Sequence, residues 1–180
     1  MRTAEAVSNT IRAFARRENQ KLMHDFGKGI FDVPELAFVY LVGKEIAGDF
    51  EGYFNSKDYD WVRETDFGNG GPTDLAFWSK NPMDTSYMLE FKMDDTHDKY
   101  TADIRKLKQP LLNKYQDRKV EKYFCGLKWV FEHQVDEFTD ILKKEFGSSA
   151  TLITSEALLT SINGEMDKHY CLFTFWMIDE

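Results

Sequence analysis

Charged and apolar side chains alternate in the segment 87–93, as they do in a strand that packs on a core. Glu90 and Lys92 fall on one face of this strand, and the opposite face carries only apolar side chains. A carboxylate and an amine at this spacing can act on one ligand. A solvated strand face gives the same pattern, so this segment alone does not distinguish a site from an ordinary surface.

A second carboxylate, Asp74, lies in the preceding strand candidate, 73–78. If the two strands pair as an antiparallel hairpin, Asp74 lies opposite Glu90 or the residue after it, and the register centred on Pro82 places it beside Glu90. The sequence leaves both registers open. Two adjacent carboxylates repel, and a divalent cation removes that cost; such oxygen ligands suit Mg²⁺ or Mn²⁺. Lys92 would then orient a water or stabilise charge on a phosphate.

The rest of the sequence predicts the elements that hold these side chains. Helices are expected over 3–25, from about 32 to 46, over 100–108 and over 134–146, with Asp32 as the cap of the second. Strands are expected over 59–65, 73–78, 87–93, 120–131, 151–153 and 170–177, and a loop around 52–57. This order predicts a mixed α/β fold in one domain over 1–180. Its core would span about 33–131, with an N-terminal helix over 3–25 and a C-terminal α/β extension over 132–180.

The expected directions of the helices place two helix N-termini at the end of the sheet where the strand 87–93 finishes. Glu35 begins the second helix there, although a carboxylate in a first turn is also stabilised by the helix dipole alone. The helix 100–108 starts at the same end. Its Tyr100, Thr101 and Lys106 could therefore face a phosphate.

These residues carry a resemblance to a known family. Gly71-Pro72-Thr73-Asp74, a spacer, and Leu89-Glu90-Phe91-Lys92 resemble the signature of the PD-(D/E)XK, or restriction-endonuclease-like, superfamily. The order helix, three strands, helix, strand resembles the αβββαβ core of that family, with a mixed central sheet flanked by helices. The segment 103–107 resembles the helix that follows the lysine. Thr73 stands where the family often has proline, so the literal Pro-Asp pair is absent.

The resemblance covers roughly the middle hundred residues and implies hydrolysis of nucleic-acid phosphodiesters, most readily of DNA, with magnesium or manganese. By that resemblance, Asp74, Glu90 and the backbone carbonyl of Phe91 would hold the metal, and Lys92 would lie beside the attacking water. Glu35 would be the acid of the first helix. The resemblance also implies a homodimer, because many relatives dimerise. The nuclease hypothesis includes a role in defence, repair or mobile-element processing.

The charge distribution leaves nucleic-acid binding open without favouring it. The formal net charge is −8, yet residues 105–128 carry eight basic against two acidic side chains, a local +6. Residues 1–28 carry six basic against three acidic side chains, a local +3. Each basic segment can also be a solvated surface.

Other residue types exclude several classes of function. The longest apolar runs are too short to span a membrane. Cys125 and Cys171 are far apart in apolar segments, which predicts buried free thiols and a cytoplasmic protein. The four histidines lack the spacing of a zinc site.

Two alternatives to a nuclease remain. The acidic balance and the aromatic content fit a catalytically silent, nuclease-like interaction protein, such as an antitoxin or an immunity protein. Hydrolysis of a small phosphate ester would use the same metal without cutting nucleic acid.

Overall fold

The computed structural model describes residues 2–94, 96–161 and 169–179. The helices are α1 (Arg2–Phe26), α2 (Glu35–Ala47), α3 (Phe50–Phe54), α4 (His97–Lys108) and α5 (Val135–Phe146). The strands are β1 (Tyr59–Asp66), β2 (Pro72–Ser79), β3 (Ser86–Met93), β4 (Val120–Phe131), β5 (Ala150–Leu159) and β6 (His169–Ile178). Short 3₁₀ turns lie at Ile30–Asp32 (η1), Asn113–Tyr115 (η2), Glu132–Gln134 (η3) and Gly147–Ser149 (η4). The mixed α/β class is confirmed.

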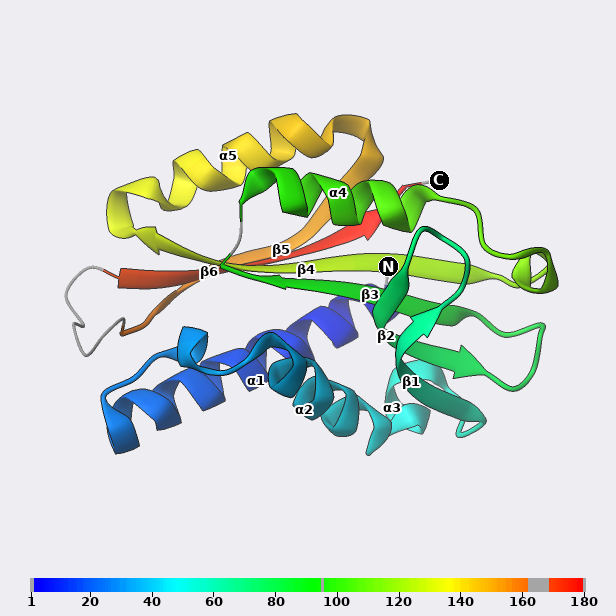
Figure 1. Ribbon diagram of the computed structural model, residues 1–180. Coiled ribbons are helices and arrows are strands. Elements are labelled where there is room, and N and C mark those ends of the chain that lie inside the picture. Colours follow the sequence, from blue (N-terminus) through cyan, green and yellow to red (C-terminus); the bar gives the residue numbers. More distant parts are fainter. Residues whose placement is uncertain (1, 95, 162–168, 180) are drawn as a thin grey trace.

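One six-stranded sheet, in the order β1-β2-β3-β4-β6-β5, forms the middle layer. The pair β3–β4 is parallel, and every other neighbouring pair is antiparallel. Figure 1 shows α1, α2 and α3 on one face and α4 and α5 on the other. The C-terminal strands are therefore part of the central sheet, because β6 pairs with β4 along its length.

Strand alternation divides the core into two apolar layers. Leu75, Leu89 and Phe91 point toward α1 and α2, whereas Ala76 and Met88 point toward α4 and α5. Aromatic side chains fill much of these layers, for example in the edge-on contact of Phe91 with Phe38 of α2, whose ring centroids lie 6.1 Å apart. Full burial of one such side chain stabilises the fold by roughly 1.5–3 kcal/mol.

Some element boundaries differ from the sequence expectations. The helix α2 begins at Glu35 with Pro34 as its N-cap, and Asp32 instead accepts a 3.2 Å hydrogen bond from the backbone N–H of Gly29. The helix α3 lies where a loop was expected, and β5 is longer than 151–153 because its pairing with β6 extends it. The helix α4 begins three residues before Tyr100.

The side chain of Asn19 ties α1 to two distant segments. It is 1% exposed, and its Nδ2 donates a 2.7 Å hydrogen bond to the carbonyl of Leu159. Its Oδ1 accepts hydrogen bonds from Ile30 N at 3.0 Å and from Thr160 Oγ1 at 2.7 Å. One amide therefore joins α1 both to the start of η1 and to the end of β5.

The two cysteines are free and buried, as the sequence predicted. Burial raises the pKa of both the Cys125 and the Cys171 thiol, so neither forms a reactive thiolate near neutral pH. Among the described residues, no helix is both long enough and apolar enough to cross a membrane.

Candidate catalytic site

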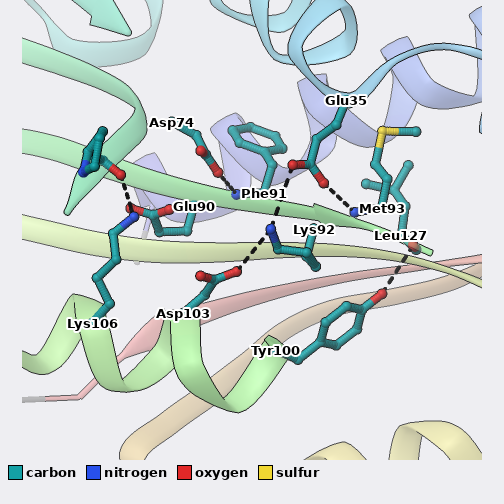
Figure 2. Close-up of polar contacts among 11 residues, drawn as sticks. Glu35, Asp74, Glu90, Phe91, Lys92, Met93, Tyr100, Asp103, Lys106 and Leu127 are labelled. Carbon is teal, nitrogen blue, oxygen red and sulfur yellow. Dashed lines mark hydrogen bonds and ion pairs between the residues drawn. The ribbon is translucent and has the colours of Figure 1, made fainter. Parts of the chain in front are cut away.

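The pairing of β2 with β3 decides where Asp74 lies. The ladder joins Leu75 to Leu89 and Ala76 to Met88, which is the register centred on residue 82. In this register Asp74 falls opposite Glu90, and the alternative register is excluded. Regular pairing ends at the Leu75–Leu89 step. Beyond it, Asp74 Oδ2 accepts a 2.7 Å hydrogen bond from the backbone N–H of Phe91, so a side chain takes the place of the ladder (Figure 2).

The strand on the other side of Asp74 is also irregular. The β1–β2 ladder joins Arg63 to Leu75 and Thr65 to Thr73, which leaves Glu64 opposite Asp74 without a ladder pair. The backbone of Glu64 has a φ of 50°, in the left-handed region that residues other than glycine rarely adopt. Such backbone costs on the order of 1–3 kcal/mol and is concentrated at functional sites.

Glu90 is a buried carboxylate beside Asp74. Only 1% of the residue is exposed, and its Oε1 lies 2.8 Å from Nζ of Lys106 in the last turn of α4. Burial first, and then the charge of Asp74, raises the pKa of Glu90 to about 8, against the opposing effect of Lys106. Glu90 therefore binds its proton more tightly than an ordinary glutamate, and Lys106 is the charge that favours its ionised form.

Lys92 lies between two carboxylates from different helices. Its Nζ is 3.5 Å from Asp103 Oδ2 of α4 and 3.7 Å from Glu35 Oε1 of α2 (Figure 2). Burial lowers the pKa of Lys92, but the charges of Asp103, Glu35 and Asp74 outweigh it and raise the pKa above its usual value. Lys92 is thus a fixed ammonium group two residues beyond Glu90 on the same strand.

Glu35 is the first residue of α2, at the helix end where the sequence placed it. Its carboxylate contacts two residues of β3. Its Oε2 accepts a 2.8 Å hydrogen bond from the backbone N–H of Met93, while Oε1 faces Lys92. Burial raises the pKa of Glu35, and the Met93 N–H and Lys92 counteract this effect. Both oxygens of Glu35 are thus engaged by β3.

Asp103 is the site residue that the sequence reasoning missed. Its burial raises its pKa, and the charges of Lys92 and Lys106 oppose that rise. The ion pairs show that α4 runs antiparallel to β3, so Lys106 faces Glu90 while Asp103 faces Lys92. The order of charges in the sequence could have indicated it. Along β3 the acid Glu90 precedes the base Lys92, and along the antiparallel α4 the acid Asp103 precedes the base Lys106, so each acid lies opposite a base.

The expectations for the start of α4 need correction. Tyr100 does not face a substrate, because its side chain is 0% exposed and its hydroxyl donates a 3.2 Å hydrogen bond to the carbonyl of Leu127. The cause is core packing, because the Tyr100 ring contacts Phe124 of β4 and Phe138 of α5. Thr101 is half-buried in the first half of the helix. Lys106 points to Glu90 and donates a hydrogen bond to the carbonyl of Pro72.

The basic segment 105–128 has its side chains in several environments. Arg105, Lys114 and Lys119 are exposed, whereas Lys128 forms a 2.9 Å ion pair with Asp94. The local positive charge is therefore partly neutralised within the protein, and the exposed members remain as candidate contacts to a polyanion.

The site offers few side-chain ligands for a metal. In residues 2–94, 96–161 and 169–179, no three histidine, cysteine, aspartate or glutamate side chains gather in a way that could hold a metal ion. Glu35 is turned to Lys92 and Met93, so the adjacent pair Asp74 and Glu90 is the part whose chemistry fits a cation. Two hard oxygen ligands suit a magnesium ion that keeps several of its waters.

Comparisons of this chain with protein-family models, with curated proteins and with solved structures each give no match.

Proposed function

We propose that this chain is a divalent-metal-dependent nuclease of the PD-(D/E)XK type, which hydrolyses phosphodiester bonds in nucleic acid, preferentially DNA. The observation that carries the proposal is the position of Asp74 opposite Glu90, with Lys92 two residues further along the same strand. Apart from the short inserted helix α3, the element order from α2 through β1, β2, β3 and α4 to β4 supports the resemblance to that superfamily.

Asp74 and Glu90 would hold a magnesium or manganese ion, and the backbone carbonyl of Phe91 would join them. When bound, the ion supplies Lewis-acid activation of a water and of the scissile phosphate. To hold the ion, Glu90 would be ionised, with any proton it carries passing to solvent; burial and the charge of Asp74, which raise its pKa, oppose this in the absence of a cation. The pair is thus poised for a cation, since a cation offsets the repulsion between the two carboxylates.

Lys92 supplies a fixed positive charge to the reaction. Its ammonium would donate hydrogen bonds to the attacking water and to a phosphate oxygen as the phosphorus–oxygen bond to the leaving group breaks. Glu35 and Asp103 are positioning residues in this mechanism, because each contacts Lys92 from a different helix. They hold the amine in one orientation and keep it protonated.

A specific observation favours a second candidate, a nuclease-like interaction protein without cleavage. Each of the two half-buried amines, Lys92 and Lys106, already lies against a carboxylate, so the negative charge of the site is partly balanced without a metal. In that interpretation the pairs Lys92–Asp103 and Lys106–Glu90 form a structural ion-pair network, and the protein partner binds at another surface. Such a protein would show no thermal shift with Mg²⁺ and would cut no substrate.

Cleavage assays with the purified chain separate these candidates. Duplex DNA, single-stranded DNA and RNA are each incubated with Mg²⁺, Mn²⁺ or EDTA, and a synthetic phosphodiester tests for small-ester hydrolysis. We expect metal-dependent cutting of DNA, abolished by Asp74→Asn or Lys92→Met. Lys128→Met is the matched control, because Lys128 lies on the neighbouring strand, is ion-paired, and is 23% exposed against 21% for Lys92. Cutting that persists in both site variants would eliminate the assignment.

A further inference from the structure

Lys106 occupies a position lined by oxygen atoms. Its Nζ lies 2.8 Å from the buried Oε1 of Glu90 and donates a hydrogen bond to the carbonyl of Pro72, two residues before Asp74 (Figure 2). A carboxylate and a backbone carbonyl are also the donors that a hard divalent cation prefers. The ammonium group therefore occupies an environment that a metal ion could equally use.

The charges of the site make Lys106 the counter-charge of Glu90 in particular. Glu35 and Asp103 are paired with Lys92, which leaves Asp74 and Glu90 with one amine between them. An ammonium group and a divalent cation beside the same buried oxygen would repel each other strongly at low local dielectric. This repulsion disfavours simultaneous contact of both with Glu90 Oε1.

The surroundings of Lys106 leave it a path outward. Gly70 and Gly71 form a turn beside the aliphatic part of Lys106. A Cβ atom placed on Gly70 would have Cγ of Lys106 as its nearest neighbour, at 4.0 Å. A Cβ at Gly71 would meet nothing within 4 Å. The Lys106 side chain is 18% exposed, and lysine has a long flexible stem. The absence of a side chain at Gly70 thus leaves space beside the stem, which is compatible with rotation of the amine toward solvent.

We infer that Lys106 is a built-in competitor of the divalent cation, which holds Glu90 in the metal-free protein and is displaced when the cation binds. The inference rests on the proposed function, because it takes Glu90 as a metal ligand. Displacement moves the amine from the carboxylate to the mouth of the site, where it meets the phosphate backbone of the substrate. The same lysine thus neutralises the empty site and contacts the nucleic acid in the loaded one.

The direct test measures the reactivity of lysine amines in the unmodified protein. The chain is acetylated briefly with and without saturating Mg²⁺, and the extent of modification is read by peptide mass spectrometry. We expect Lys106 to react several-fold faster with Mg²⁺, while Lys128 is unchanged as the internal control. An equal or slower rate at Lys106 overturns the inference. Heat of Mg²⁺ binding, and its loss in Glu90→Gln, is measured in parallel and reports on the metal site independently.

The second test removes the Lys106 amine and measures how tightly Mg²⁺ then binds. Lys106→Met is titrated with Mg²⁺ by calorimetry at about pH 9, where proton uptake by Glu90 competes less with the cation. We expect binding about tenfold tighter than in the parent chain, because the competing ammonium is gone. Lys128→Met should bind as the parent does. Weaker or equal binding by Lys106→Met overturns the inference and leaves the metal site standing. Absence of binding in the parent and in the variant overturns both proposals.

Discussion

The carboxylate of Asp74 accepts a 2.7 Å hydrogen bond from the backbone N–H of Phe91, the residue that follows Glu90. The bond forms where the β2–β3 ladder ends, so Asp74 both completes the backbone pairing and places a negative charge beside Glu90. One side chain therefore has a structural and an electrostatic role, and the two can be separated by substitution.

Substitution of Asp74 should separate stability from activity. Asp74→Asn keeps an oxygen acceptor for Phe91 N–H, so we expect nearly unchanged stability and a loss of cleavage of roughly a hundredfold or more, since the charge is gone. Asp74→Ala leaves the N–H unpaired and should also cost about 1–3 kcal/mol of unfolding free energy. Urea denaturation and the DNA cleavage assay measure the two effects. Equal stability loss in both variants would contradict the role of this hydrogen bond.

The pKa of Glu90 predicts how stability depends on pH in the absence of metal. Glu90 binds its proton more tightly in the folded state, at a pKa of about 8, than at the ordinary value of 4.5. Its contribution to stability is therefore complete below pH 4.5 and is lost as the pH rises toward 8. The slope from this one group is at most about 1.4 kcal/mol per pH unit.

Glu90→Gln should flatten that decline, because glutamine cannot ionise. Denaturant unfolding in EDTA across this pH range makes the measurement. Glu45→Gln is the control, since Glu45 is exposed and ion-paired to Arg17 on the surface. If Glu90→Gln and the parent chain lose stability in parallel, the raised pKa is not the cause.

Asp103 should set the alkaline limit of activity through Lys92. The Asp103 carboxylate lies 3.5 Å from the Lys92 amine and is the largest of the charges that raise its pKa. Asp103→Asn should therefore move the alkaline limb of the profile of kcat/KM against pH to lower pH, with a loss of about tenfold on that limb. Asp98→Asn, at an exposed position in the first turn of the same helix, should leave the profile in place. A uniform loss at every pH would indicate a structural role alone.

Asn19 should carry a large share of stability for one polar side chain. Asn19→Ala removes four hydrogen bonds, to Met23, Ile30, Leu159 and Thr160, and leaves the buried Ile30 N–H without this partner. We expect a loss of about 2–4 kcal/mol in unfolding free energy. Asn9→Ala on the exposed side of the same helix should change it by less than about 0.5 kcal/mol, as surface substitutions do. Thermal and urea denaturation give both values.

Local patterning was sufficient for much of the site. The alternation along 87–93 placed Glu90 and Lys92 on one face, because side-chain direction in a strand repeats every two residues whatever surrounds it. Glu35 at the start of α2 followed from the same reasoning about chain direction. The register of Asp74 remained open in the sequence, since both pairings are compatible with a short connection.

Tertiary structure alone decided what α4 contributes. The rotation of a helix about its own axis is fixed by packing, and the burial of Tyr100 turned Asp103 toward Lys92 and Lys106 toward Glu90. The length of β5 likewise came from its pairing with β6. The sequence determined which strand faces carry charge, because that periodicity is local. The fold determined which charges meet, because contacts between distant segments depend on how whole elements pack.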